Sequence, residues 1–202
     1  MKIYFVRHGE TDWNKKKIYQ GHTDIPLNEK GIQQAESAAD YLKDREIEAV
    51  YTSDLKRAYR TGEIIARPHN LQPVTDNRLR EINFGAWEGL DYNGIYTKYE
   101  KEFDDWYKDV FNTRIPKGGS FKDVLDNLLD FLHDKSIQKY QEIVVATHGG
   151  VIKALLGHIK KSETILWEQQ VSPGSITVIS YHIEQDELQI EEVNLLPNSQ
   201  FN

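Results

Sequence analysis

Three short apolar segments constrain the fold of this chain more than any other feature. They are residues 3–6, 49–52 and 143–147, and each is a continuous run, typical of a strand covered on both faces. Helical patterns follow the runs, so we expect an α/β three-layer sandwich: a mostly parallel central sheet with helices on both faces. Residues 175–183 and 187–194 indicate two more strands, which we expect to form a hairpin at the sheet edge.

Four amphipathic segments predict the covering helices. Asn28 is placed to cap a helix whose apolar residues recur at spacings of three and four: Ile32, Ala35, Ala39 and Leu42. Ser53 is expected to cap the next helix, which ends before Pro68. Residues 121–132 indicate a long helix, and another is expected to begin directly after His148.

An unusually aromatic segment interrupts this alternation. Residues 84–121 hold ten of the 22 aromatic residues, and five of them recur at helical spacing: Tyr92, Tyr96, Tyr99, Phe103 and Trp106. We interpret the stripe as the packing face of an inserted helical pair, with a lid that lines a substrate pocket as the alternative. Residues 1–202 are therefore expected to form a single domain with a lid insertion at about 85–120.

Composition excludes several classes of function. The net charge of −7 argues against a nucleic-acid partner or a membrane surface, and the absence of cysteine excludes disulfides and thiolate sites. The sequence shows neither the apolar stretch of a secretory signal nor an apolar stretch of about 20 residues that could span a membrane. We therefore expect a cytoplasmic protein, and the sequence leaves its oligomeric state open.

Cations and imidazoles follow the three apolar runs. Arg7 and His8 end the first, Arg57 lies soon after the second, and His148 and Gly149 follow the third. In open parallel sheets, ligands bind beyond the carboxyl ends of the strands. If the three strands are neighbours, two arginines and two histidines converge on one crevice. Such a group is suited to binding phosphate.

These residue types also allow phosphoryl transfer. A neutral imidazole held through one nitrogen can attack phosphorus with the other, and a second histidine kept cationic can offset negative charge. The leaving oxygen needs a proton, for which Glu81 in "RLREINFGAWEG" is the candidate. The alternatives are a structural role for the histidines and an ion pair between Glu81 and Arg80.

Four motifs in order resemble the histidine phosphatase superfamily, in its phosphoglycerate-mutase-like branch: "RHGET", "TSDLKRA", "LREINFGAWEG" and "THGGV". The resemblance implies that His8 is phosphorylated and that Glu81 donates a proton. It implies phosphoryl or substrate contacts for a further group: Arg7, Asn14, Gln20, Gly21, Arg57, His148 and Gly149. It implies no metal and no organic cofactor, and its substrate would be a small phosphorylated metabolite.

Two departures bear on the reaction. Mutases of the family carry paired arginines after the catalytic glutamate, but no arginine stands between Glu81 and Arg114, where the cations are Lys98, Lys101 and Lys108. Phosphatase members often show "GGES", whereas this chain reads "KGGSFKDV". We therefore expect a phosphatase similar to α-ribazole or broad-specificity phosphatases. A mutase and a catalytically weak phospholigand-binding module remain the alternatives.

Overall fold

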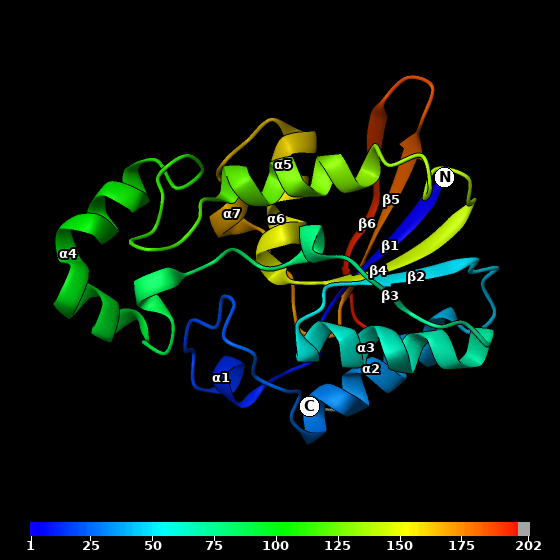
Figure 1. The fold of residues 1–202 in the computed structure, drawn as a ribbon, viewed down its shortest axis with the longest axis horizontal. Coiled ribbons are helices and arrows are strands. Elements are labelled where there is room, and N and C mark those ends of the chain that lie inside the picture. Colours follow the sequence, from blue (N-terminus) through cyan, green and yellow to red (C-terminus); the bar gives the residue numbers. More distant parts are fainter. Residues whose placement is uncertain (198–202) are drawn as a thin grey trace.

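A six-stranded mixed sheet forms the centre of the computed structural model, which describes residues 1–197 (Figure 1). The spatial order of the strands is β3-β2-β4-β1-β5-β6. Their bounds are β1 Lys2–Arg7, β2 Ala49–Thr52, β3 Val74–Thr75, β4 Glu142–Thr147, β5 Ile176–His182 and β6 Glu187–Leu195. The first four are parallel, and β5 and β6 add an antiparallel hairpin at one edge. The predicted α/β class, the three neighbouring strands and the edge hairpin are confirmed.

Helices cover both faces of the sheet because successive strand residues point to opposite sides. Ile3 and Phe5 pack in the cluster of α5 and α6, whereas Tyr4 and Val6 pack in that of α2 and α3. The α-helices are α1 Asp12–Lys15, α2 Glu29–Leu42, α3 Lys56–Ala66, α4 Tyr92–Lys108, α5 Phe121–Leu132, α6 Gly149–Lys160 and α7 Ile165–Glu168. Short 3-10 helices are η1 Arg67–His69, η2 Asn77–Leu79 and η3 Gly85–Trp87.

The two predicted helix caps have different outcomes. Asn28 caps α2, and its side chain accepts a hydrogen bond from Gly31 N at 2.8 Å. The expectation for Ser53 is wrong, because α3 begins at Lys56 and its N-cap is Leu55. The Ser53 hydroxyl instead bonds His148, on the neighbouring strand end, at 2.9 Å. The local pattern predicted a helix cap, but in the folded protein the Ser53 side chain bonds a residue that is distant in the sequence.

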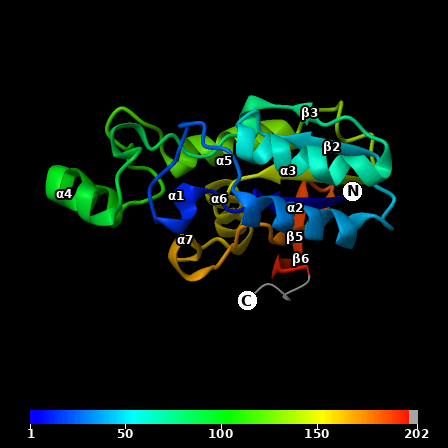
Figure 2. The same cartoon turned by 90° about the horizontal axis from the view of Figure 1, so that it is seen from below.

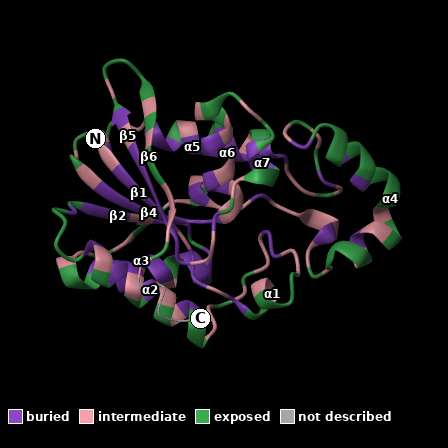
Figure 3. Ribbon diagram, turned by 180° about the vertical axis from the view of Figure 1, so that it is seen from behind, coloured by how far each residue is buried: buried purple, intermediate pink, exposed green. Residues whose placement is uncertain are grey.

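The aromatic segment forms α4, which lies apart from the sheet at one end of the molecule (Figures 1 and 2). It consists of two helical halves joined at a kink at Tyr99 (φ −139°, ψ 36°), which agrees with the expected helical pair. Phe103 and Trp106 are buried against Trp87, while most of α4 is exposed (Figure 3). The division into a single domain with a lid insertion stays a prediction. No helix within residues 1–197 has the length and apolarity needed to cross a membrane.

Candidate active site

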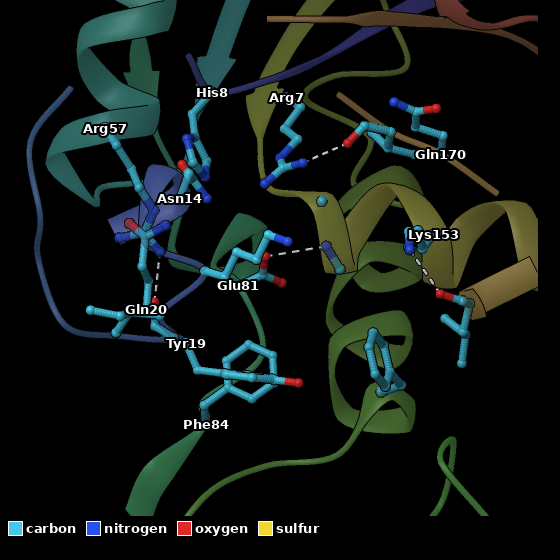
Figure 4. A pocket seen from close by; sticks show the side chains of 18 of the residues that line it. Arg7, His8, Asn14, Tyr19, Gln20, Arg57, Glu81, Phe84, Lys153 and Gln170 are labelled. Atoms are coloured by element: carbon cyan, nitrogen blue, oxygen red, sulfur yellow. Dashed lines mark hydrogen bonds between the residues drawn. The ribbon is translucent and has the colours of Figure 1, made fainter. Parts of the chain in front are cut away.

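The carboxyl ends of β1, β2 and β4 bring the predicted groups to one edge of the sheet. His8 N donates to Thr147 O at 2.9 Å, and Ser53 N donates to Ala146 O at 3.0 Å. The segments that follow the three strands therefore leave the sheet side by side. The edge opens into a cavity of about 570 Å³ that Arg7, His8, Arg57 and Glu81 help to line (Figure 4). The predicted convergence of charged groups therefore occurs.

His8 is held as a neutral imidazole at the floor of this cavity. Its Nδ1 lies 2.7 Å from Gly9 O, and because a carbonyl only accepts, Nδ1 carries the proton and Nε2 keeps a lone pair. Burial, followed by the charges of Arg57 and Arg7, lowers the pKa of His8 well below its ordinary value. Glycine is needed at position 9, because a Cβ there would lie 2.1 Å from Gly31 O.

His148 lies behind His8 rather than in the cavity wall. Its ring is fully buried and meets the His8 ring edge to face, with centroids 5.2 Å apart. Burial, followed by the charges of Arg57, His8 and Arg7, lowers its pKa well below the ordinary value. The expectation that His148 is cationic concerns the protein with a phosphoryl group bound, and it stays a prediction. The negative charge of a bound phosphoryl group would have to offset the cost of a protonated imidazole at this buried position.

Arg57 is fixed by a loop that sequence reasoning assigned to the substrate. Its Nη2 donates to Gly21 O at 2.7 Å and its Nη1 to Thr23 O at 3.0 Å, while burial lowers its pKa to about 10. Gly21 and Gln20 both line the cavity. The loop therefore aims the guanidinium and contributes wall residues itself.

Arg7 and the polar residues after it form the adjoining wall. Arg7 Nη1 donates to Val171 O at 2.6 Å, and Gly149 lies against the same guanidinium, since a Cβ there would be 3.2 Å from Nε. Thr11 joins Asn14 and Gln20, because its hydroxyl contacts the amide oxygen of each at 3.0 Å. The amide nitrogens of both residues are thereby turned away from Thr11.

Glu81 faces the first turn of α6. Its Oε2 accepts from Gly150 N at 3.2 Å, and a Cβ on residue 150 would lie 2.2 Å from Oε1, so the second glycine of "THGG" makes room for this carboxylate. Arg80 pairs with Asp54 at 2.5 Å instead of with Glu81. The proposed ion-pair role of Glu81 is therefore wrong.

Glu88 belongs to the same sequence motif but has a different function. Its two oxygens accept from His22 N at 2.8 Å, Thr23 N at 2.9 Å and the Thr23 hydroxyl at 2.5 Å. These bonds hold the loop of residues 20–24, which in turn holds Arg57. Glu10 is bonded to Asn28. Neither carboxylate lines the cavity.

Three residues of the aromatic segment 84–121 line the far wall of the cavity, as the alternative interpretation expected, whereas the other residues of this wall were not predicted from the sequence. Aromatic rings from five segments line it: Tyr19, Phe84, Trp106, Phe121 and Trp167. Lys153, Gln170 and Val171 complete this side. One signal for Lys153 was available, because it stands four residues after Gly149 on α6 and therefore shares its face. Nothing local in the sequence marks Trp167 or Gln170, because the short α7 is positioned by tertiary contacts.

Comparison with known proteins decides the family. The family model described as histidine phosphatase superfamily (branch 1) matches residues 3–195, nearly the whole chain. This chain belongs to the histidine phosphatase superfamily. Membership confirms the resemblance of the four motifs, and it confirms the prediction of a phosphoric monoester hydrolase.

Individual relatives of this histidine phosphatase carry several names. Putative phosphoserine phosphatase 2 from Hydrogenobacter thermophilus is 29% identical over 198 residues, covering 96% of each chain. Phosphoglycerate mutase-like protein 4 from Arabidopsis thaliana is 41% identical, over 80% of this chain and 72% of the relative. The structure of the α-ribazole phosphatase from Shigella flexneri superposes with a TM-score of 0.86, at 26% identity and full coverage of both chains.

Proposed function

We propose that this histidine phosphatase hydrolyses phosphomonoesters of small metabolites by passing the phosphoryl group first to His8 and then to water. The observation that carries the proposal is the state of His8. Its ring is 2% exposed, neutral, and bonded through Nδ1 to a carbonyl, so Nε2 is the nucleophilic atom. Two guanidinium groups beside it supply the positive charge that a transferring phosphoryl group needs.

In the first step His8 Nε2 forms a bond to phosphorus, and the bond from phosphorus to the ester oxygen breaks. Glu81 gives its proton to that oxygen, which leaves as an alcohol. In the second step a water attacks phosphorus and loses a proton to Glu81, and the nitrogen–phosphorus bond breaks. Inorganic phosphate leaves, and His8 and Glu81 return to their starting states.

Seven further groups would bind the phosphoryl oxygens and the adjoining part of the substrate. We assign this role to Arg7, Asn14, Gln20, Gly21, Arg57, His148 and Gly149. The arginines carry the charge, the two amides can donate hydrogen bonds, and His148 gains its proton only once the dianion is present. No step calls for a metal ion or an organic cofactor.

A small phosphorylated metabolite is the substrate class we infer, in the cytoplasm and without a nucleic-acid or membrane partner. Relatives named for phosphoserine, α-ribazole phosphate and glucosyl-3-phosphoglycerate support this class. The net charge of −7 does not suit binding to polyanions. Which metabolite is taken depends on the far wall of the cavity.

Phosphoglycerate mutase activity is the second candidate, because some relatives are named phosphoglycerate mutase-like protein or probable phosphoglycerate mutase. We disfavour it, since Lys98, Lys101 and Lys108 do not line the cavity and no arginine replaces them there. We expect release of phosphate from 3-phosphoglycerate to exceed its conversion to 2-phosphoglycerate, with or without added bisphosphoglycerate. Efficient interconversion of the two monophosphoglycerates would make the mutase the better description.

The proposal is tested by trapping the intermediate. Purified protein should release phosphate from p-nitrophenyl phosphate, and a rapid quench should capture a phosphoenzyme that acid destroys and alkali preserves, because phosphohistidine is an acid-labile phosphoramidate. His8→Ala should abolish both adduct and turnover. Turnover by His8→Ala at the wild-type rate, or an adduct on another residue, would refute the mechanism. Absence of turnover in the wild type would favour the binding module.

A further inference from the structure

The far wall of the cavity contains a cation that the phosphoryl chemistry does not use. Lys153 lies on α6, and its Nζ donates to Leu166 O at 2.8 Å, its one hydrogen bond within residues 1–197 (Figure 4). In the view of Figure 4 it stands on the opposite side of the cavity from Arg57. No ion pair of the described residues includes it.

Such a cation is costly by itself. Lys153 is half-buried, and burial, with the charge of Arg7, lowers its pKa, while Glu81 opposes that shift. An ammonium group has three donors, and one carbonyl satisfies only one of them. A bound anion would supply the missing charge and the missing acceptors.

A second donor in the same wall also lacks an acceptor. The indole N–H of Trp106 is buried and finds no partner within residues 1–197. Trp106 packs edge to face on Trp167 of α7, with centroids 5.4 Å apart, and Lys153 bonds the neighbouring residue of α7. Lys153 and Trp106 thus both line the cavity beside Leu166 and Trp167 of α7. A group that only accepts hydrogen bonds fits that place.

We propose that Lys153 pairs with a carboxylate on the alcohol part of the substrate, so that small phosphorylated carboxylic acids are preferred. This rests on the proposed phosphatase function and names its substrate class. One ammonium and one N–H match a monoanion, whereas the phosphate end of the cavity has two guanidinium groups. Lys17 also lines the cavity, but it is exposed to solvent and so contributes less.

The test compares substrates that differ only in the carboxylate. Phosphoserine is paired with phosphoethanolamine, and 3-phosphoglycerate with glycerol 3-phosphate. The wild type should have the higher kcat/KM for the acid of each pair. Lys153→Gln keeps a donor for Leu166 O but removes the charge, and it should reduce that ratio by about tenfold or more. Lys160→Gln, the same change at the exposed end of α6, should leave the ratio as it is.

Lys153→Met distinguishes recognition from mere support of α7. If Lys153 only holds the Leu166 carbonyl, Lys153→Met should lower kcat/KM equally for both members of a pair, and Lys153→Gln should change neither value. That result overturns the proposal. A ratio that falls in Lys17→Gln and survives in Lys153→Gln overturns it as well. If Lys153 instead governs a preference for fructose 1,6-bisphosphate over fructose 6-phosphate, the second anion is phosphate, and the carboxylate assignment is wrong.

Failure of this inference and failure of the phosphatase function give different results. Turnover of p-nitrophenyl phosphate with no preference for either acid overturns only the carboxylate subsite. Absence of turnover with every ester refutes the phosphatase function itself.

Discussion

At the scale of single residues, the proposed mechanism assigns attack on phosphorus to His8 and protonation of the leaving oxygen to Glu81. Glu81→Gln keeps the shape of the side chain but cannot give up a proton, so it should slow alkyl phosphates by about 10²–10⁴-fold. Hydrolysis of p-nitrophenyl phosphate should slow much less, because nitrophenolate leaves without a proton. The measurement is kcat/KM for both esters in the wild type and the variant.

Arg57→Ala is the matched control for this selectivity. The guanidinium acts on the phosphoryl oxygens that every substrate shares, so both esters should slow by the same factor. If Glu81→Gln also slows both esters equally while the phosphoenzyme still forms at the normal rate, Glu81 is not the leaving-group acid.

At the scale of elements, the loop of residues 20–24 transmits the effect of Glu88 to the site. Glu88→Gln replaces one of the two accepting oxygens with an amide NH₂ group. This donor would face an N–H or O–H donor of the loop, so that hydrogen bond is lost. We expect a loss of about 1–3 kcal/mol in the free energy of unfolding. Displacement of Arg57 should lower kcat/KM by about ten- to hundredfold. Urea denaturation and steady-state kinetics measure the two effects.

The kinetic effect of Glu88→Gln should be the same for good and poor leaving groups, unlike that of Glu81→Gln. Glu36→Gln, on the exposed face of α2, is the matched control and should change neither property. A selective loss on alkyl phosphates would assign Glu88 a direct proton-transfer role and contradict the positioning role.

At the scale of the whole molecule, the buried histidines link stability to pH. The pKa values of His8 and His148 lie well below 6.5 in the folded protein, whereas in the unfolded chain they are near 6.5. Below pH 6.5 the unfolded state therefore binds protons that the folded state does not. The free energy of unfolding should fall there by up to about 1.4 kcal/mol per pH unit for each histidine, and level off above it.

Urea titrations between about pH 5.5 and 7.5, where imidazoles dominate the titration, measure this dependence. The double variant His8→Asn, His148→Asn should show a shallower slope, and His182→Asn, at an exposed position, should retain the wild-type slope. An unchanged slope in the double variant would show that these two imidazoles do not lose their protons on folding.

The fold class, and the gathering of most of the candidate site residues at one sheet edge, could be predicted from the sequence. Short apolar runs predict buried parallel strands, and the carboxyl ends of neighbouring parallel strands must lie together. That rule is enough to place Arg7, His8, Arg57 and His148 beside one another. Asn28 capped its helix as expected because a cap depends on bonds within one turn. The edge hairpin was likewise predictable, since its two strands are adjacent in the chain.

Which of several similar groups faces the cavity depends on tertiary contacts that no local pattern contains. Glu81 and Glu88 share one motif, but the path of the loop beyond the sheet turns one to α6 and the other to the loop of residues 20–24. Ser53 bonds His148 across two strand ends, which no local pattern encodes. The lowered pKa values of His148 and Lys153 follow from burial and neighbouring charges. Those depend on residues distant in the chain, so they exist only once the chain has folded.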